Sequence, residues 1–294
     1  LYDPQQHRSY ITLFGEDLGV SCLCWEALAL FSLGYPERAL KRVQEAIALA
    51  QESSHPTSLG YALASAAHVY RNRNEESATQ ARAAALLELA AEQGFVLRMA
   101  QGSMYRGWAL AMQGQKQEGI AQLHQGLAAF RATGAEFFRP GYLALLVEAY
   151  KSAQQTEEGL AVLAEALGAV NKTEERFYES ELYRLKGELT LQKGSRGWRL
   201  GAGVLSQTPS PQPLTPSTQA EAEESFLKAI DIARQQQAKS WELRATTSLA
   251  RLWQQQDKTA DAHKLLYDVY HWFTEGFDTK DLQEAKALIE ELSH

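Results

Sequence analysis

Two cysteines, Cys22 and Cys24, stand two positions apart in a chain that has no other cysteine. A thiol pair of this kind can bind a metal ion or cycle between a dithiol and a disulfide. Residues two apart on a helix, however, project about 200° from each other, so the two thiols would face different sides. We therefore interpret both cysteines as small packing residues of a protein in a reducing compartment.

Histidines and carboxylates are the other side chains that could hold a metal or move a proton. The histidines, at positions 7, 55, 68, 124, 263, 271 and 294, show no metal-ligand spacing. Acidic pairs such as Glu75 and Glu76 fall where we expect helices to begin, and there they favour the helix dipole. A paired-carboxylate hydrolase is the alternative interpretation of these pairs. The motifs of P-loops, serine hydrolases and zinc proteases do not occur in the sequence. We therefore predict no catalytic residue, no metal site and no cofactor.

The composition is that of a folded chain with an acidic balance. The 294 residues are 45% hydrophobic and 22% charged, and the formal net charge is −7. A negative balance argues against nucleic acid, which requires a basic surface, and against anionic membranes. No apolar run is long enough to span a bilayer, and no signal peptide is recognisable, so we expect a cytoplasmic protein. The chain starts at Leu1 rather than at a methionine, and we expect it to be a piece of a longer protein.

Small residues recur along the chain at a nearly constant interval. Each follows a short polar turn, and together they are Ala39, Ala78, Gly119, Gly159, Ala222 and Ala262. Their successive positions differ by 39, 41, 40, 63 and 40, and the larger value of 63 predicts an insertion in the fifth unit. An internal repeat with a period of about 40 residues is typical of a helical solenoid.

Three further places in each unit follow the same period. We call the recurring small residue of each unit its mark, so Gly119 is the mark of the third unit. Small residues also stand twelve positions before the mark and seven positions after it, as Gly107 and Gly126 do. The residue four positions after the mark is mostly apolar. The second unit has Ala66, Arg82 and Ala85 at these places, and the clear exceptions to the rule are Val147, Arg82 and Val269. Glycine costs roughly 1 kcal/mol relative to alanine inside a helix. We therefore expect Gly107 and Gly126 to lie where paired helices approach closely.

This pattern resembles the tetratricopeptide repeat. The stretches RGWALAMQGQKQEGIAQLHQGL and LKGELTLQKG with AEAEESFLKAI match it best, with a turn between two helices that carry small residues. The departure is in length, about 40 residues instead of about 34. The resemblance covers about residues 19–277. It implies an all-α, right-handed superhelical solenoid of about six antiparallel helix pairs, whose first helices line a concave groove.

A narrower resemblance concerns four segments. They are LGYPERALKRVQEAIALAQESSHP, RGWALAMQGQKQEGIAQLHQGLAAFRATGAEFFRP, ELYRLKGEL and SLARLWQQQDKTADAHKLLYDVYHWFTEGFDTKDLQEAKALIEEL. They look like the C-terminal helical region of large bacterial signalling proteins with a class III adenylate/guanylate cyclase domain and a P-loop ATPase domain upstream. This resemblance implies a regulatory and protein-interaction module, whose partners include the upstream domains of the same chain.

The expected organisation has three parts. Residues 1–18 are irregular or belong to a truncated preceding repeat, residues 19–277 form the repeat domain, and residues 278–294 form a C-terminal capping helix. The buried face of that helix would consist of Leu282, Ala285, Leu288, Ile289 and Leu292. The insertion covers about residues 194–218. Its four prolines, Pro209, Pro211, Pro213 and Pro216, favour an extended or irregular loop. The alternative is a proline-motif docking site anchored by Trp198 and Arg199.

The tetratricopeptide register places candidate partner-binding residues on the first helices. They are Phe31, Tyr70, Arg71, Met104, Trp108, Met112, Glu148, Lys151, Arg184, Glu188 and Arg251. Aromatic anchors and arginines often dominate binding energy, and the cations would bind carboxylates. The alternatives are that Trp108 packs against a neighbouring unit and that the cations pair with nearby carboxylates. The expected function is non-catalytic binding of a protein or peptide in the groove. The alternative function is a sensor for a small ligand or short peptide.

Overall fold

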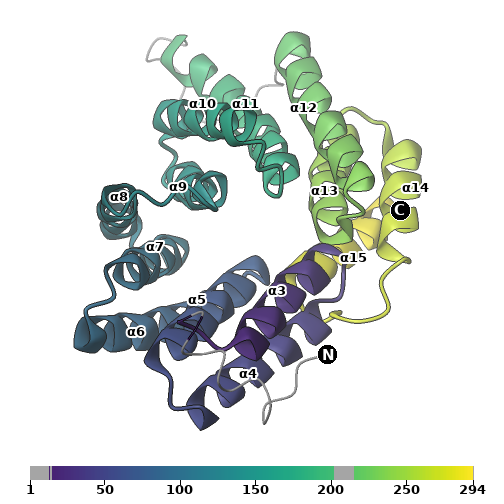
Figure 1. The fold of residues 1–294 in the computed structure, drawn as a ribbon. Coiled ribbons are helices and arrows are strands. Elements are labelled where there is room, and N and C mark those ends of the chain that lie inside the picture. Colours follow the sequence, from purple (N-terminus) through teal and green to yellow (C-terminus); the bar gives the residue numbers. More distant parts are fainter. Residues whose placement is uncertain (1–12, 14, 202–214, 294) are drawn as a thin grey trace. The chain divides into compact units, whose positions relative to one another are not determined.

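The computed structural model describes residues 13, 15–201 and 215–293, and within these ranges the chain is built of helices and turns without a strand (Figure 1). It divides into two compact units, residues 1–136 with 273–283 and residues 137–272 with 284–294. The first unit holds α3 (Leu18–Ser32), α4 (Pro36–Glu52), α5 (Pro56–Asn72), α6 (Glu76–Gln93), α7 (Val96–Met112) and α8 (Lys116–Ala132). The second unit holds α9 (Arg139–Ser152), α10 (Thr156–Thr173), α11 (Glu179–Gly201), α12 (Pro216–Gln235), α13 (Lys239–Gln255) and α14 (Thr259–Tyr270). The boundary at residue 283 falls inside α15 (Lys280–Leu292).

A left-handed backbone conformation recurs at a constant interval, just after the end of a helix. The residues of this series, all with positive φ, are Gly34, Ser54, Asn74, Gly94, Gly114, Gly134, Gln154, Glu174, Gln237 and Asp257. After Gly34, Asn74, Gly94, Gly114, Gln154, Gln237 and Asp257, the N–H of the next residue turns back onto the last helical turn, as when Gln115 N donates to Leu110 O at 2.9 Å. This is a Schellman-type helix end. One helix with its turn therefore takes about 20 residues, and a helix pair takes about 40, as in other helical repeats of this size.

The interval from Glu174 to Gln237 contains the insertion. Gly194 would be the next left-handed residue, but α11 continues through it to Gly201. The expected loop at 194–218 is therefore wrong at both ends, because residues 194–201 extend a helix and Pro216 begins α12. Pro209, Pro211 and Pro213 lie outside the described residues, and of Trp198 and Arg199 only the helical backbone is described.

The register expected for the second helix pair is wrong by one residue. Thr79, five positions after Asn74, is fully buried, whereas Ala78 is only half-buried. With Thr79 in place of Ala78, the first four marks stand at positions 39, 79, 119 and 159, and their spacing becomes constant. The exception at Arg82 disappears as well, because Ala83 now takes that place and is fully buried.

Glycines set the distance between α7 and α8. A β-carbon on Gly126 would lie 2.6 Å from Met104 Cγ, and one on Gly107 would lie 2.8 Å from the carbonyl oxygen of Gly119. Later residues of α8 thus meet earlier residues of α7, so the two helices are antiparallel. The expectation that Gly107 and Gly126 lie at helix–helix contacts is confirmed.

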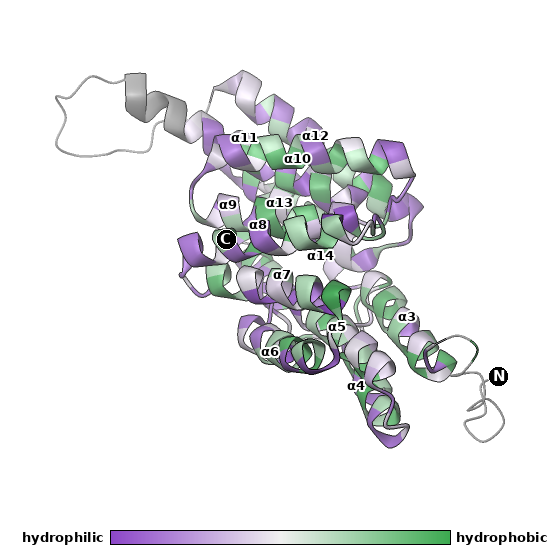
Figure 2. Ribbon diagram, turned by 60° about the vertical axis from the view of Figure 1, so that its left-hand side comes forward, coloured by the Kyte–Doolittle hydropathy of each residue, from purple (hydrophilic) through white to green (hydrophobic). Residues whose placement is uncertain are grey.

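The first helices of successive pairs contact one another within each unit. In the first unit α3 packs on α5 and α5 on α7, and in the second unit α9 packs on α11 and α11 on α13. Each second helix packs on its own partner and on the next first helix of its unit. First helices are therefore buried on most sides, as residues 62–72 of α5 show, whereas a second helix buries one stripe. In α4 that stripe is Ala39, Val43, Ala46 and Ala50. Hydrophobic and hydrophilic residues alternate along the helices (Figure 2).

The C-terminal segment supplies a contact that the sequence did not predict. Residues 273–283 belong to the first unit, where the Glu275 carboxylate accepts hydrogen bonds from the backbone N–H groups of Glu37 and Arg38, both at 3.0 Å. Arg73 also pairs with Asp278 at 3.2 Å. The amphipathic helix expected at the C-terminus is present as α15. Its predicted apolar residues Leu282, Ala285, Leu288, Ile289 and Leu292 are buried.

Candidate partner-binding site

The candidate residues fall into two groups, one in each unit. Tyr70 and Arg71 lie on α5 with Met104, Trp108 and Met112 on α7, while Phe31 lies on α3 and is buried. In the second unit Glu148 and Lys151 lie on α9, Arg184 and Glu188 on α11, and Arg251 on α13. All of them lie on the first helices of their pairs, as the tetratricopeptide register predicts.

The candidates of the first unit are mostly core residues. Trp108 and Arg71 are each 1% exposed, and the Arg71 guanidinium carbon lies 5.8 Å from the centroid of the Trp108 ring. Tyr70 and Met104 are also buried, and Met104 packs against Gly126. Among these five residues Met112 is the most exposed, and it is half-buried. Trp108 on α7 therefore packs against Arg71 of α5, which agrees with the packing alternative for Trp108.

A hydrogen bond between side chains also joins α5 to α7. His68 Nδ1 lies 2.9 Å from the hydroxyl oxygen of Tyr105, and both residues are buried. Burial, and then the positive charge of Arg71, lower the pKa of His68 from 6.5 to about 3. The imidazole is therefore neutral at physiological pH, and it serves as a structural hydrogen-bonding group.

Three consecutive first helices of the second unit are joined by a network of charged side chains. On α11, Arg184 donates to both carboxylate oxygens of Glu181, at 2.5 and 2.8 Å, and to Glu188 at 2.5 Å. Lys151 on α9 donates to the other oxygen of Glu188. On α13, Ser248 donates to Glu188 at 3.0 Å. Arg244, also on α13, lies 3.6 Å from Glu181. We call these six residues the inner charge network.

The protonation state of the inner charge network is fixed by its own pairs. Burial alone would raise the pKa of Glu188, but Arg184 and Lys151 outweigh it and hold the pKa far below the usual range. Burial alone would lower the pKa of Arg184, but Glu181 and Glu188 outweigh it and raise the pKa. The carboxylate and the guanidinium are both charged at neutral pH.

The candidate cations of the second unit are matched by carboxylates of the same chain. Lys151 and Arg184 share Glu188, and Arg251 pairs with Glu284 at 2.9 Å. A carboxylate of a partner would therefore have to compete with these glutamates. The network is nevertheless reachable, since the side chain of Glu188 is 21% exposed and that of Lys151 is 32% exposed. It can offer both a cation and an anion to a partner.

Sequence reasoning missed Glu181, Arg244 and Ser248. Glu181 had a local signal, because it stands three residues before Arg184 on the same helix and such pairs meet. Ser248 had none, since it lies 60 residues beyond Glu188 and the insertion separates the two.

The cysteines occupy two different environments. Cys22 is exposed and Cys24 is buried, so their side chains lie on different sides of α3. Burial raises the pKa of Cys24 to about 11, which keeps its thiol protonated. Throughout the described residues, no group of three or more His, Cys, Asp and Glu side chains could hold a metal ion. The same part of the chain contains no helix that is both long and apolar enough to cross a membrane.

A hollow of about 430 Å³ lies on the exposed face of α12, away from the candidates. Its lining comes from one helix and consists of Ala220, Glu223, Glu224, Leu227, Lys228 and Asp231. Because a single helix forms this lining, the hollow is a surface depression.

The family model of anaphase-promoting complex subunit 5 matches residues 18–73, which span α3 to α5. No curated protein is significantly similar in sequence. Solved structures with a similar fold include those of a Rap protein and of RapI. A Rap protein complexed with competence and sporulation factor is 13% identical, with a TM-score of 0.58 over 94% of this chain and 74% of that one. The apo form of RapI is 13% identical, with a TM-score of 0.56 over 99% of this chain and 87% of that one. The fold is a tetratricopeptide-like helical solenoid. At this identity the likeness concerns the fold alone.

Proposed function

We propose that the chain is a non-catalytic module for protein interaction and regulation, which binds a protein or peptide partner along its row of first helices. The inner charge network carries this proposal, because it places partly exposed charges of both signs on three adjoining first helices. Charges at an interface contribute most to specificity and association rate. The similar Rap structure supports the proposal as well, since that protein was crystallised with competence and sporulation factor.

The module belongs, in this proposal, to a larger bacterial signalling protein of the cytoplasm. The resemblance to the C-terminal region of cyclase and ATPase proteins supports this context. Binding of a partner would change the packing of the helix pairs and thereby the output of upstream domains. The test is to measure cyclase or ATPase output of the intact parent protein with and without residues 19–277. Equal output would exclude the regulatory role.

A partner-binding role needs a separate test. A bound partner should be lost when Lys151 is changed to alanine, because that change removes the most exposed cation of the network. The matched control is Lys172→Ala at the end of α10, which removes an exposed lysine of the same helix pair. Equal retention of the partner by the two variants would exclude the first-helix row of the second unit as the binding site.

The observations favour a protein partner over a small ligand. A sensor would need an apolar pocket beside Trp108, but Trp108 is buried beneath Arg71 and packed between α5 and α7. Enclosed ligand sites are usually concave and apolar. The hollow on α12 is a surface depression with four charged side chains in its lining.

A further inference from the structure

Residues 275–281 belong to the first unit and lie against the beginnings of α4 and α6. The segment reads EGFDTKD and carries three carboxylates and one lysine. All four charged side chains contact groups of complementary chemistry within residues 37–76 of the same unit. The chain thus holds one of its own segments in the way that a protein holds a short peptide ligand.

Glu275 and Gly276 make reciprocal contacts with the first turn of α4. The Glu275 carboxylate accepts hydrogen bonds from the N–H groups of Glu37 and Arg38, both at 3.0 Å, and from Arg38 Nε at 3.1 Å. In return, Gly276 N donates to the Glu37 carboxylate at 2.8 Å. Gly276 has φ +78°, and a β-carbon on it would lie 2.2 Å from Pro36 Cγ. This end of the surface therefore selects the dipeptide Glu-Gly.

The two aspartates of the segment contact the turn between α5 and α6. Arg73 Nη2 donates to Asp278 at 3.2 Å, and Asn74 Nδ2 donates to Asp281 at 2.9 Å. The side chain of Arg73 is only 3% exposed, and its Nη1 has no hydrogen-bond partner among the described residues. A buried donor left unpaired is costly, so the guanidinium favours a further acceptor. This end of the surface therefore selects carboxylates.

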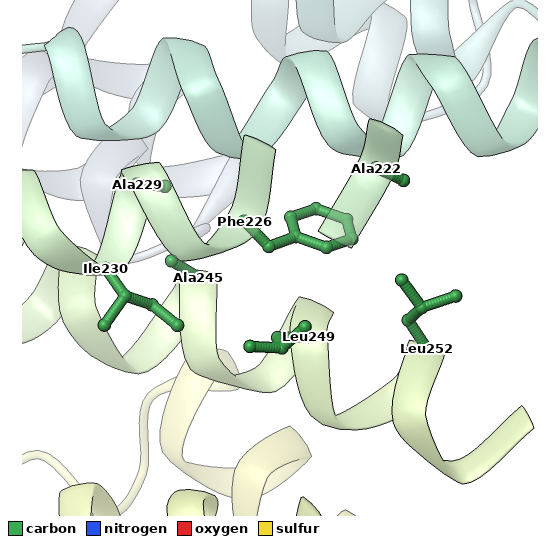
Figure 3. Close-up of a cluster of buried hydrophobic side chains, with 7 residues drawn as sticks. All are labelled: Ala222, Phe226, Ala229, Ile230, Ala245, Leu249 and Leu252. Carbon is green, nitrogen blue, oxygen red and sulfur yellow. The ribbon is translucent and has the colours of Figure 1, made fainter. Parts of the chain in front are cut away.

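Polar contacts hold this segment in place, whereas apolar packing joins the helices. In the second unit, Phe226 of α12 lies in one buried cluster with Leu249 and Leu252 of α13 (Figure 3). The large apolar side chain of the segment, Phe277, is instead 49% exposed. The attachment of residues 275–281 therefore depends mainly on charge and hydrogen bonding.

Contacts of this kind can be exchanged for those of another chain. The side chain of Asp278 is 68% exposed, and Lys280, which lies 3.7 Å from Glu76, is also more than half exposed. Exposed ion pairs contribute little individually and weaken with salt. The segment stays in place because its tether gives it a high effective concentration at the surface. A free peptide with the same contacts competes on chemical grounds alone.

We propose that this surface of the first unit is a binding site for an acidic peptide segment of a partner protein, which residues 275–281 occupy while no partner is bound. The recognised pattern is Glu-Gly followed by two aspartates, spaced as Asp278 and Asp281 are. A partner segment with this pattern displaces the chain's own segment and frees the first turn of α15, which contains Asp281. The inner charge network lies in the second unit, so this site is tested independently of it.

Binding of a fluorescent peptide with the sequence of residues 273–283, FTEGFDTKDLQ, tests this proposal. Its anisotropy is measured with the full wild-type chain and with the full-length triple variant Glu275→Ala, Asp278→Ala and Asp281→Ala, whose own segment has lost its carboxylates. The triple variant should bind the peptide about tenfold or more tightly than the wild type, because the tethered competitor is weakened. A peptide with Glu275→Gln, Asp278→Asn and Asp281→Asn should bind neither protein.

Site variants in the triple-variant background show whether the peptide binds at this surface. Arg38→Ala and Asn74→Ala should each weaken binding about threefold or more, because each removes a donor to a peptide carboxylate. The matched control is Arg106→Ala on α7, which removes an exposed arginine of the same unit and should leave binding unchanged.

Two results would overturn the proposal. One is equal binding, or equal absence of binding, of the peptide by the wild type and the triple variant. The other is binding that Arg38→Ala, Asn74→Ala and Arg106→Ala leave the same. If circular dichroism shows that the triple variant does not fold, the double variant Asp278→Ala and Asp281→Ala, which keeps the Glu275 contact with α4, replaces it in every comparison.

Discussion

Gly107 and Gly119 face each other across α7 and α8 so closely that neither can carry a β-carbon. Such an atom on Gly119 would lie 2.5 Å from the carbonyl oxygen of Gly107, and one on Gly107 would lie 2.8 Å from the carbonyl oxygen of Gly119. The obstacle on each side is backbone, which cannot rotate away as a side chain can. The helix-forming cost of the two glycines is thus offset by the close approach of two backbones.

Replacing Gly119 by alanine should therefore destabilise the protein. Forcing a methyl group into this contact costs about 1–3 kcal/mol. Alanine gains roughly 1 kcal/mol over glycine in helix propensity. Because the contact is with backbone, we expect the overpacking cost to be the larger of the two. We expect a net loss of up to about 2 kcal/mol in the free energy of unfolding, measured by urea denaturation. The control is Gly168→Ala in α10, where no atom lies within 4 Å of the added carbon. That change should stabilise the protein by up to about 1 kcal/mol. Equal effects of the two changes would contradict the contact.

Two substitutions at left-handed turn positions should change the free energy of unfolding in opposite directions. Gln154 has φ +63° and Gly114 has φ +96° at equivalent places after α9 and α7. The left-handed conformation costs a residue with a β-carbon about 1 kcal/mol, whereas glycine adopts it freely. Gln154→Gly should therefore raise the free energy of unfolding by up to about 1 kcal/mol, and Gly114→Ala should lower it by about 1 kcal/mol. Thermal melts of both variants against the wild type test this, and a shift of the same sign in both would contradict it.

The repeat could be predicted because close packing restricts the residue type at fixed places. Gly107, Gly119 and Gly126 leave room for a neighbouring backbone or side chain, so their spacing records the helix length directly. The register failed in the second pair for a physical reason. Its turn uses Asn74 where the first and third pairs use Gly34 and Gly114, and Ala78 and Thr79 are both small enough for the buried place. Only the backbone distinguishes them.

The site could be predicted in part. Lys151, Arg184 and Glu188 were placed on the correct row from the period, because the period fixes which helices are first helices. The pairing among them was not predicted, since it depends on side-chain directions and on Ser248 beyond the insertion. The contact of Glu275 with the start of α4 follows no period at all, because its partners are backbone N–H groups 237 and 238 residues away.

Glu275 should act as a cap for α4. Tyr35, at the N-cap position, makes no side-chain capping hydrogen bond, and the Glu275 carboxylate takes over by accepting from Glu37 N and Arg38 N. Glu275→Ala should lower the free energy of unfolding by about 1 kcal/mol, which is typical of a lost cap. It should also accelerate amide hydrogen exchange in the first turn of α4. The control is Glu52→Ala, which removes an exposed carboxylate from the other end of that helix. Unchanged exchange in Glu275→Ala would contradict the capping role.

His68 should make the protein sensitive to mild acid. Its pKa in the folded protein is about 3, below the value of about 6.5 in an unfolded chain, so only the unfolded state takes up a proton between these values. The free energy of unfolding should then fall as the pH drops below 6.5, by about 2 kcal/mol at pH 5. In His68→Gln this part of the pH dependence should vanish. Urea denaturation of both proteins at pH 7, 6 and 5 measures it, and parallel pH profiles would exclude a buried neutral imidazole.

Glu188 makes the opposite kind of contribution, because its carboxylate is stabilised by Arg184 and Lys151. Its pKa in the folded protein is lowered, so the stability that it adds is present above the unfolded value of about 4.3 and is lost as the pH falls below that value. Glu188→Gln should cost about 2 kcal/mol at pH 7, less than a fully buried pair, since the side chain is 21% exposed. The difference from the wild type should shrink as the pH falls from about 4.3.

The control for Glu188 is Glu157→Gln. Glu157 pairs with Lys193 at 3.1 Å, but both side chains are more than half exposed. A surface pair of this kind is worth about 0–1 kcal/mol, and added salt weakens it. Glu157→Gln should therefore change the free energy of unfolding little at any pH. If Glu188→Gln and Glu157→Gln lower the free energy of unfolding equally little at pH 7, Glu188 does not join the first helices of the second unit. If Glu188→Gln alone is costly and the cost fades in acid, the network holds those helices together through this carboxylate.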